Sequence, residues 1–139
     1  MTKKIAVIND LSGFGKCSLT AAISVIAAMG VQPCPLPTAV LSAQTGYPSY
    51  YCDDYTDRME FIYREGEKMQ VHFDGIYTGF LSGEHQIEKV LEFLDIFLKK
   101  DTFLLVDPVM GDNGDLYSSI PETMIPQMRK LIGKADIIV

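Results

Sequence analysis

Three segments of the chain place carboxylate, hydroxyl and glycine residues directly after apolar runs. Asp10 and Ser12 follow the first apolar run. Thr45 comes after a later run, and Asp107 ends a third. If these runs are strands of one parallel sheet, the polar side chains gather at the edge formed by the carboxyl ends of the strands, where open α/β sheets bind small molecules. Glycine turns that lead into helices also attract phosphate there. The pattern predicts a small-molecule site that handles phosphate.

The first segment shares part of the phosphate-binding P-loop pattern, since it contains Gly15, Lys16 and Ser18. Asp10 stands where the first glycine of a P-loop belongs, and Cys17 replaces the hydroxyl residue that would hold Mg²⁺. A true P-loop is therefore disfavoured. A glycine-bearing turn between a strand and a helix is the simpler interpretation of this segment taken alone.

The third segment, residues 107–115, offers an aspartate at a strand end followed by a turn rich in proline, glycine and asparagine. Asp107 in this place could hold Mg²⁺ or a water molecule near phosphates. The alternative is an ordinary pair of Asp-Pro and Asn-Gly turns. The spacing excludes an EF-hand calcium loop, because the required order of acidic residues and the closing glutamate are missing.

The elements that must position these residues alternate between strand and helix. The apolar patterns predict strands at 4–9, 38–42, 75–78, 103–107 and 136–139. They predict helices at 18–29, at 84–100 and over part of 121–132. The range 55–69 is ambiguous because Gly66 interrupts its helical pattern. Strands that alternate with helices of this length predict an α/β fold with a mainly parallel central sheet flanked by helices.

Composition limits the class of protein. The 139 residues, 47% of them hydrophobic, suffice for one domain with a core, and the net charge of −6 argues against nucleic acid or an anionic membrane as a partner. Three widely spaced cysteines and two isolated histidines predict reduced thiols and no zinc site. The apolar stretches are too short for a signal peptide or a membrane span. We expect a soluble, cytoplasmic protein.

Four segments together resemble the pyridoxal kinase branch of the ribokinase-like superfamily. They are Asn-Asp-Leu-Ser-Gly at 9–13, Thr-Gly-Tyr at 45–47, Tyr-Thr-Gly-Phe at 77–80 and Asp-Pro-Val-Met-Gly at 107–111. Hydroxymethylpyrimidine kinases share the last segment, whereas Thr-Gly-Tyr favours the vitamin B6 kinases. The resemblance covers the whole chain but about the first half of the family's length. It implies that residues 1–139 are the N-terminal part of one ribokinase-like kinase domain, truncated before the C-terminal nucleotide-binding half.

The resemblance also implies an activity and roles for individual residues. The activity is ATP-dependent phosphorylation of the 5′-hydroxymethyl group of pyridoxal, pyridoxamine or pyridoxine. Ser12 and Thr45 would bind polar groups of the pyridine ring, and Asp107 would be a metal ligand beside the triphosphate. Asp112 would lie close behind, and Tyr117 would belong to the loop that covers the nucleotide. The resemblance implies ATP and Mg²⁺ as cofactors, with a monovalent cation as an optional third, and it implies a homodimer.

The chain departs from the family pattern in one respect that matters for catalysis. The family's catalytic base is the aspartate of a Gly-x-Gly-Asp motif, which these 139 residues lack, since the segment 111–115 matches it only superficially. We therefore expect no catalytic base in this chain and no activity from it alone. A hydroxymethylpyrimidine kinase and a non-catalytic fragment or vitamer-binding module remain the alternatives. A Rossmann-like oxidoreductase is disfavoured, because the first turn lacks G-x-G-x-x-G.

Overall fold

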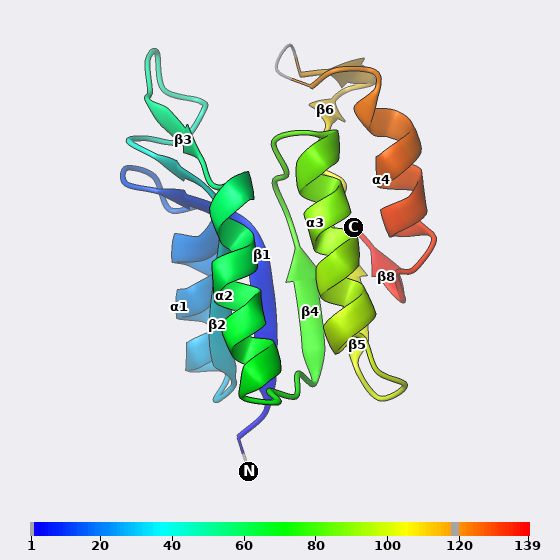
Figure 1. Cartoon of the computed structure of the whole chain (residues 1–139). Helices are drawn as coiled ribbons and strands as arrows, with labels where there is room; N and C mark the ends of the chain where they lie inside the picture. The colour runs from blue at the N-terminus through cyan, green and yellow to red at the C-terminus, as the bar shows by residue number, and fades with distance from the viewer. Residues whose placement is uncertain (1, 118–119) are drawn as a thin grey trace.

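The computed structural model describes residues 2–117 and 120–139, and for Asp112 the backbone alone. Its elements are, in chain order, β1 (Lys4–Ser12), α1 (Ser18–Ala28), β2 (Gln32–Leu41), β3 (Cys52–Asp54), α2 (Thr56–Lys68), β4 (Gly75–Thr78), α3 (Glu84–Phe97), β5 (Phe103–Val106), β6 (Gly111–Asp112), β7 (Asp115–Leu116), α4 (Met124–Ile132) and β8 (Ile137–Ile138). Figure 1 shows the helices arranged around a central sheet. The predicted α/β class is confirmed.

The central sheet has six strands in the order β3-β2-β1-β4-β5-β8. All neighbouring pairs are parallel except β2 and β3. The order reverses at β1, because the chain moves outward from β1 to β2 and then returns to place β4 on the other side of β1. A reversal of this kind opens a crevice at the carboxyl ends of the two strands, and ligands of open α/β sheets bind there.

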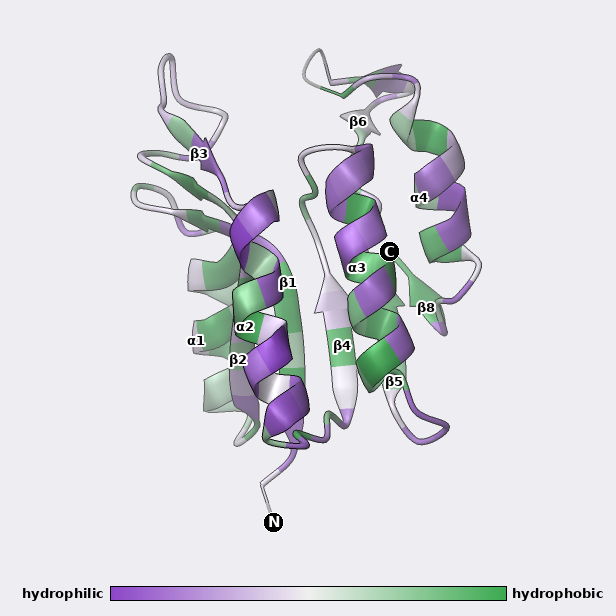
Figure 2. Cartoon of the chain, in the orientation of Figure 1, coloured by the Kyte–Doolittle hydropathy of each residue, from purple (hydrophilic) through white to green (hydrophobic). Residues whose placement is uncertain are grey.

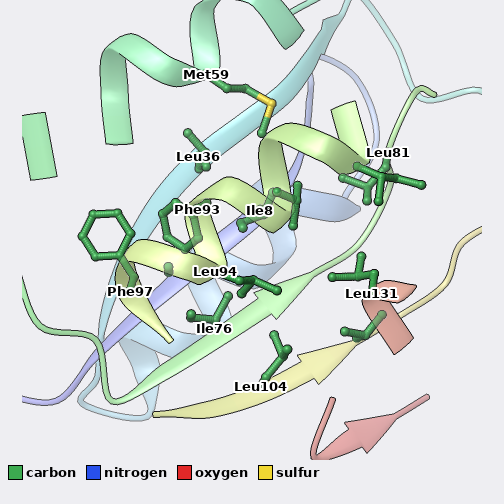
Figure 3. Close-up of a cluster of buried hydrophobic side chains, with 14 of the residues drawn as sticks. Ile8, Leu36, Met59, Ile76, Leu81, Phe93, Leu94, Phe97, Leu104 and Leu131 are labelled. Atoms are coloured by element: carbon green, nitrogen blue, oxygen red, sulfur yellow. The ribbon is translucent and has the colours of Figure 1, made fainter. Parts of the chain in front are cut away.

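Helices cover the two faces of the sheet unequally. Helices α2, α3 and α4 pack side by side over one face, and α1 packs over β1 and β2 on the other (Figure 1). The main core lies under α2, α3 and α4 and contains Ile8, Ile76 and Leu104 from three neighbouring strands (Figure 3). Figure 2 shows that polar residues occupy much of the outward side of α2 and α3. Burial of the apolar sides of these helices holds the strand ends in place.

Strand β2 begins six residues earlier than the sequence predicts, at Gln32. The segment contains Pro33, Pro35 and Pro37, and prolines argue against a strand because they donate no hydrogen bond. Their alternation removes the conflict. The N–H of Gln32 points to β1 and donates to Lys3 O. Because the direction of the N–H groups alternates along a strand, the nitrogens of the three prolines point to the opposite edge of β2. No hydrogen bond is lost there, since β3 pairs with β2 only at residues 39–41.

Two further elements depend on glycine. The ambiguous range 55–69 forms helix α2, and Gly66 allows it to approach α3, since a Cβ at that position would lie 3.3 Å from the Phe97 ring. Residues Asn113 and Gly114 have φ angles of 52° and 93° and connect β6 to β7. Two consecutive positive φ angles are typical of a type I′ hairpin turn. The Asn-Gly turn considered for this segment is therefore confirmed.

Replacing Thr78 with valine is expected to raise the free energy of unfolding by about 1 kcal/mol. Thr78 ends β4 and is fully buried, and its hydroxyl has no hydrogen-bond partner among the described residues. Valine keeps the shape and removes the unsatisfied polar atom. Urea denaturation measures the change. Thr102→Val is the matched control and should destabilise the chain, because the hydroxyl of Thr102, which is also buried, donates to Phe73 O at 2.8 Å. A loss of stability in Thr78→Val would contradict the prediction.

Candidate functional site

A cavity of about 210 Å³ opens at the carboxyl end of the sheet, where the strand order reverses. The ends of β1 and β4, the loops after β2 and β5, and the start of α1 contribute its lining, which consists of Asn9, Asp10, Cys17, Ser18, Leu41, Gln44, Thr45, Tyr77, Phe80, Asp107 and Val109. The lining combines aromatic and aliphatic side chains with several polar groups. Sites for small organic molecules have this composition.

The end of β1 is tied to the loop after β4 through Asn9. The buried Asn9 Oδ1 accepts hydrogen bonds from Phe80 N at 2.9 Å and from Asp10 N at 3.0 Å. The N–H of Gly79 donates to Ile8 O at 2.8 Å. These bonds continue the pairing of β1 with β4 past the end of the regular ladder. They place the side chains of Asp10 and Phe80 in the same cavity.

Replacing Gly79 with alanine is expected to cost about 2–3 kcal/mol of folding free energy and to weaken ligand binding in the cavity. A Cβ at Gly79 would lie against the Asn9 amide, 2.7 Å from its Oδ1. The buried amide would have to move and would release Phe80 N. Gly83→Ala is the control, because nothing lies within 4 Å of a Cβ there and its backbone is extended. Chemical denaturation measures both variants, and equal stabilities would contradict the prediction.

Asp107 follows β5 and is half-buried at the cavity. Burial raises the pKa of its carboxyl group above the ordinary value. Burial also raises the pKa of Tyr77, and the negative charge of Asp107 adds to that effect. Within the described part of the chain, no side chain or N–H donates a hydrogen bond to the Asp107 carboxylate. Its oxygens are thus available to a cation or to a ligand that donates a hydrogen bond.

The structure brings together part of the predicted site. Thr45 and Asp107 both line the cavity. Ser12 lies behind it, 1% exposed, and donates a hydrogen bond at 2.8 Å to Asp10 Oδ2, which does face the cavity side. Tyr117 is not among the lining residues, is 39% exposed, and donates its N–H to Met110 O. The Asp112 side chain lies outside the described part of the structure, although its backbone belongs to β6.

The site also contains residues that the sequence interpretation gave no role, notably Asn9, Gln44 and Phe80. Asn9 and Phe80 belong to two of the four segments that carry the family resemblance. Their position in those segments could have identified them as site residues. Gln44 had no such signal. Its side chain packs against Gly15, where a Cβ would lie 2.7 Å from Gln44 Cγ and where the φ angle of 107° favours glycine.

The described residues contain no cluster of three or more histidine, cysteine or acidic side chains that could hold a metal ion by itself. Asp10 and Asp107 are the carboxylates of the cavity lining. Carboxylate oxygens suit Mg²⁺, which is commonly held by one or two protein carboxylates together with substrate phosphates. The donor set therefore fits a cation that a phosphorylated ligand helps to bind. Across the described helices, none is long and apolar enough to cross a membrane.

Comparisons with known proteins find similarity to small-molecule kinases under two names. A protein of Bacteroides thetaiotaomicron, provisionally named a phosphomethylpyrimidine kinase and crystallised with pyridoxal, is 48% identical with a TM-score of 0.95. The pyridoxal kinase of Lactobacillus plantarum is 30% identical with a TM-score of 0.89. The match covers 99% of this chain in both cases, and 48% and 49% of those chains.

A protein of Schizosaccharomyces pombe, provisionally named a pyridoxal kinase, is 26% identical in an alignment that covers 99% of this chain and 45% of that protein. The chain thus spans about half the length of the relatives that it matches. No family model matches the chain. Sequence and fold nevertheless agree with the resemblance carried by the four segments. Over nearly its whole length the chain is therefore similar in sequence and fold to about half of the pyridoxal kinases that it matches.

Proposed function

We propose that the full-length protein transfers the γ-phosphoryl group of ATP to the 5′-hydroxymethyl group of pyridoxal, pyridoxamine or pyridoxine. One observation carries the proposal. The cavity lies at the strand-order reversal and is lined by residues of all four segments shared with the pyridoxal kinases. A solved relative that is 48% identical contains pyridoxal. We also propose a homodimer, which the family resemblance implies, and a cytoplasmic location, which the sequence composition led us to expect.

The side chains of the cavity suit the proposed substrate. Tyr77 and Phe80 offer aromatic walls for a pyridine ring, and the Thr45 hydroxyl can bind one of its polar groups. Ser12 would act on the ligand through Asp10, because its buried hydroxyl does not line the cavity and donates a hydrogen bond to Asp10 Oδ2. Asp10 is thereby fixed in its orientation at the cavity. The pyridine ring of the substrate would lie between the aromatic side chains on one side of the cavity and the polar side chains on the other.

Asp107 supplies the proposed cation site. Its half-buried carboxylate accepts no hydrogen bond from described residues, and a hard cation prefers oxygen ligands of this type. Bound Mg²⁺ would neutralise charge on the phosphate groups during transfer. The protein's own task is to align the hydroxyl acceptor and to exclude water, because phosphoryl transfer needs little covalent assistance. We assign Asp112 and Tyr117 to the part of the site that would bind the nucleotide. We also propose that the protein binds a monovalent cation.

The second candidate substrate is hydroxymethylpyrimidine. The provisional name of the Bacteroides relative favours it, and that protein is up to 49% identical to this chain. The decisive experiment compares steady-state rates of the full-length protein on pyridoxal, pyridoxine, pyridoxamine and hydroxymethylpyrimidine, with ATP and Mg²⁺. We expect the highest kcat/KM on a B6 vitamer. Phosphorylation of the pyrimidine without phosphorylation of any vitamer would replace our assignment with the alternative.

A further inference from the structure

We propose that Gln86 is a positioning residue, which holds the segment Gly79–Ser82 at the cavity through a ring of buried hydrogen bonds and thereby sets the affinity for the ligand. The proposal rests on the proposed function in one respect, the choice of pyridoxal as the ligand. Gln86 belongs to α3 and does not line the cavity. Its influence must therefore pass through the segment between β4 and α3.

The side-chain amide of Gln86 is 1% exposed and makes three hydrogen bonds. Oε1 accepts from Ser82 N at 2.8 Å, and Nε2 donates to Thr38 O at 2.7 Å and to Thr56 Oγ1 at 2.9 Å. These partners come from β2, from the first residue of α2 and from the loop before α3. A buried amide is costly unless it is satisfied, so its partners are held to this geometry.

Thr38 carries the connection from Gln86 to Phe80. Its buried Oγ1 donates to Phe80 O at 2.9 Å, while Phe80 N donates to Asn9 Oδ1 at 2.9 Å. Both backbone polar groups of Phe80 are therefore bound by side chains of neighbouring strands, although Phe80 itself lies in a loop. The next residue, Leu81, is buried in the main core (Figure 3). The segment thus presents Phe80 to the cavity and anchors Leu81 on the opposite side.

Asp54 completes the ring of hydrogen bonds, because it connects Ser82 to Thr56 and both of these residues are bound to Gln86. The Asp54 carboxylate accepts a hydrogen bond from the Ser82 hydroxyl and another from Thr56 N at 2.8 Å. Burial opposes the ionised carboxylate, but the bonds from Ser82 and Thr56 outweigh it and keep the pKa of Asp54 below its ordinary value. Ser82 is therefore bound through both its N–H and its side chain. These hydrogen bonds join β2, the end of β3 and the loop after β4 to the first turns of α2 and α3.

A preordered segment binds a ligand more tightly than one that must be ordered on binding. Without Gln86, the N–H of Ser82 loses its partner, and the Thr38 carbonyl keeps the bond from Tyr55 N at 3.0 Å but loses the one from Gln86. The segment then samples other conformations, and part of the binding free energy is spent on returning Phe80 to the cavity wall. The expected effect is a weaker affinity with no change in the groups that touch the ligand.

The test uses the 139-residue chain, pyridoxal as the probe, and two variants, Gln86→Leu and Thr38→Val. Two readouts are taken, the dissociation constant for pyridoxal by calorimetric titration and the hydrogen exchange of the Phe80 and Ser82 amides. We expect pyridoxal to bind about tenfold more weakly to both variants, and these two amides to exchange faster. Thr38→Ser keeps the hydroxyl and should restore both values.

Thr102→Val separates positioning from general destabilisation. It removes the same kind of bond, from a buried threonine hydroxyl to a backbone carbonyl, at the opposite end of the sheet. It should lower stability as Thr38→Val does, yet leave the affinity and the two exchange rates unchanged. If Thr38→Val and Thr102→Val behave alike in affinity and exchange, the positioning role is overturned. If neither the wild-type chain nor the full-length protein binds pyridoxal, the proposed function fails, while the exchange rates still decide the positioning role.

Discussion

The 139-residue chain, supplied with ATP, Mg²⁺ and pyridoxal, is expected to form pyridoxal 5′-phosphate at the rate of the uncatalysed control. The family's catalytic base belongs to a Gly-x-Gly-Asp motif that the sequence lacks. Loss of a general base costs about 10²–10⁴ in rate, and loss of the N–H groups that stabilise the transferring group costs about 10²–10³ more. Asp10 and Asp107 line the cavity, but the proposed roles of both are in binding.

Chromatographic detection of pyridoxal 5′-phosphate measures this directly, with the full-length protein as the positive control. A second measurement excludes a trivial explanation, since an unfolded chain would also be inactive. Binding of pyridoxal to the same preparation shows that the cavity is formed. Product above the no-enzyme control would show that these residues contain a catalytic base after all. Binding without turnover would agree with a half-site that holds the substrate.

Replacing Asp107 with asparagine is expected to lower kcat/KM of the full-length protein for pyridoxal phosphorylation by about 100-fold or more. The proposed role of the carboxylate is to hold Mg²⁺ beside the transferring phosphate, and a neutral amide is a poor ligand for that cation. The size and shape of the side chain are conserved, so the cavity should keep its form. Steady-state kinetics over a range of Mg²⁺ concentrations measures the loss. The control, Asp95→Asn, changes an exposed carboxylate of α3 and should leave kcat/KM unchanged.

The same substitution should stabilise the 139-residue chain at neutral pH when divalent cations are absent. Burial raises the pKa of Asp107 above 3.8, so the folded chain binds a proton more tightly there than the unfolded chain does. The free energy of unfolding therefore falls as the pH rises from 3.8 through the raised pKa. Asparagine does not titrate, and its advantage over wild type grows across that window. Urea denaturation at pH 3.5 and pH 7 checks the sign, and an advantage that shrinks with pH would contradict it.

The strands that end at the candidate site could be predicted because their sequences are short apolar runs followed by polar residues. Both faces of β1 are covered, so its apolar run is nearly continuous, and β4 and β5 are short apolar segments that end at polar loops. The three elements missed were β3 and the β6–β7 hairpin, which are two or three residues long and carry too little pattern. The early part of β2 was missed because its prolines argue against a strand until the edge they face is known.

Three features can be predicted from the sequence alone: the alternation of strands and helices, the polar segments at the strand ends, and the resemblance to pyridoxal kinases. These are local properties, encoded in residues close together in the chain. Only the folded chain shows that Phe80 contacts Asn9, 71 positions away in the sequence, and that Gln86 contacts Thr38, 48 positions away. It also places Ser12 behind Asp10 instead of at the cavity surface. Such contacts follow from strand order and register, because each side chain meets partners that the folded sheet brings to it.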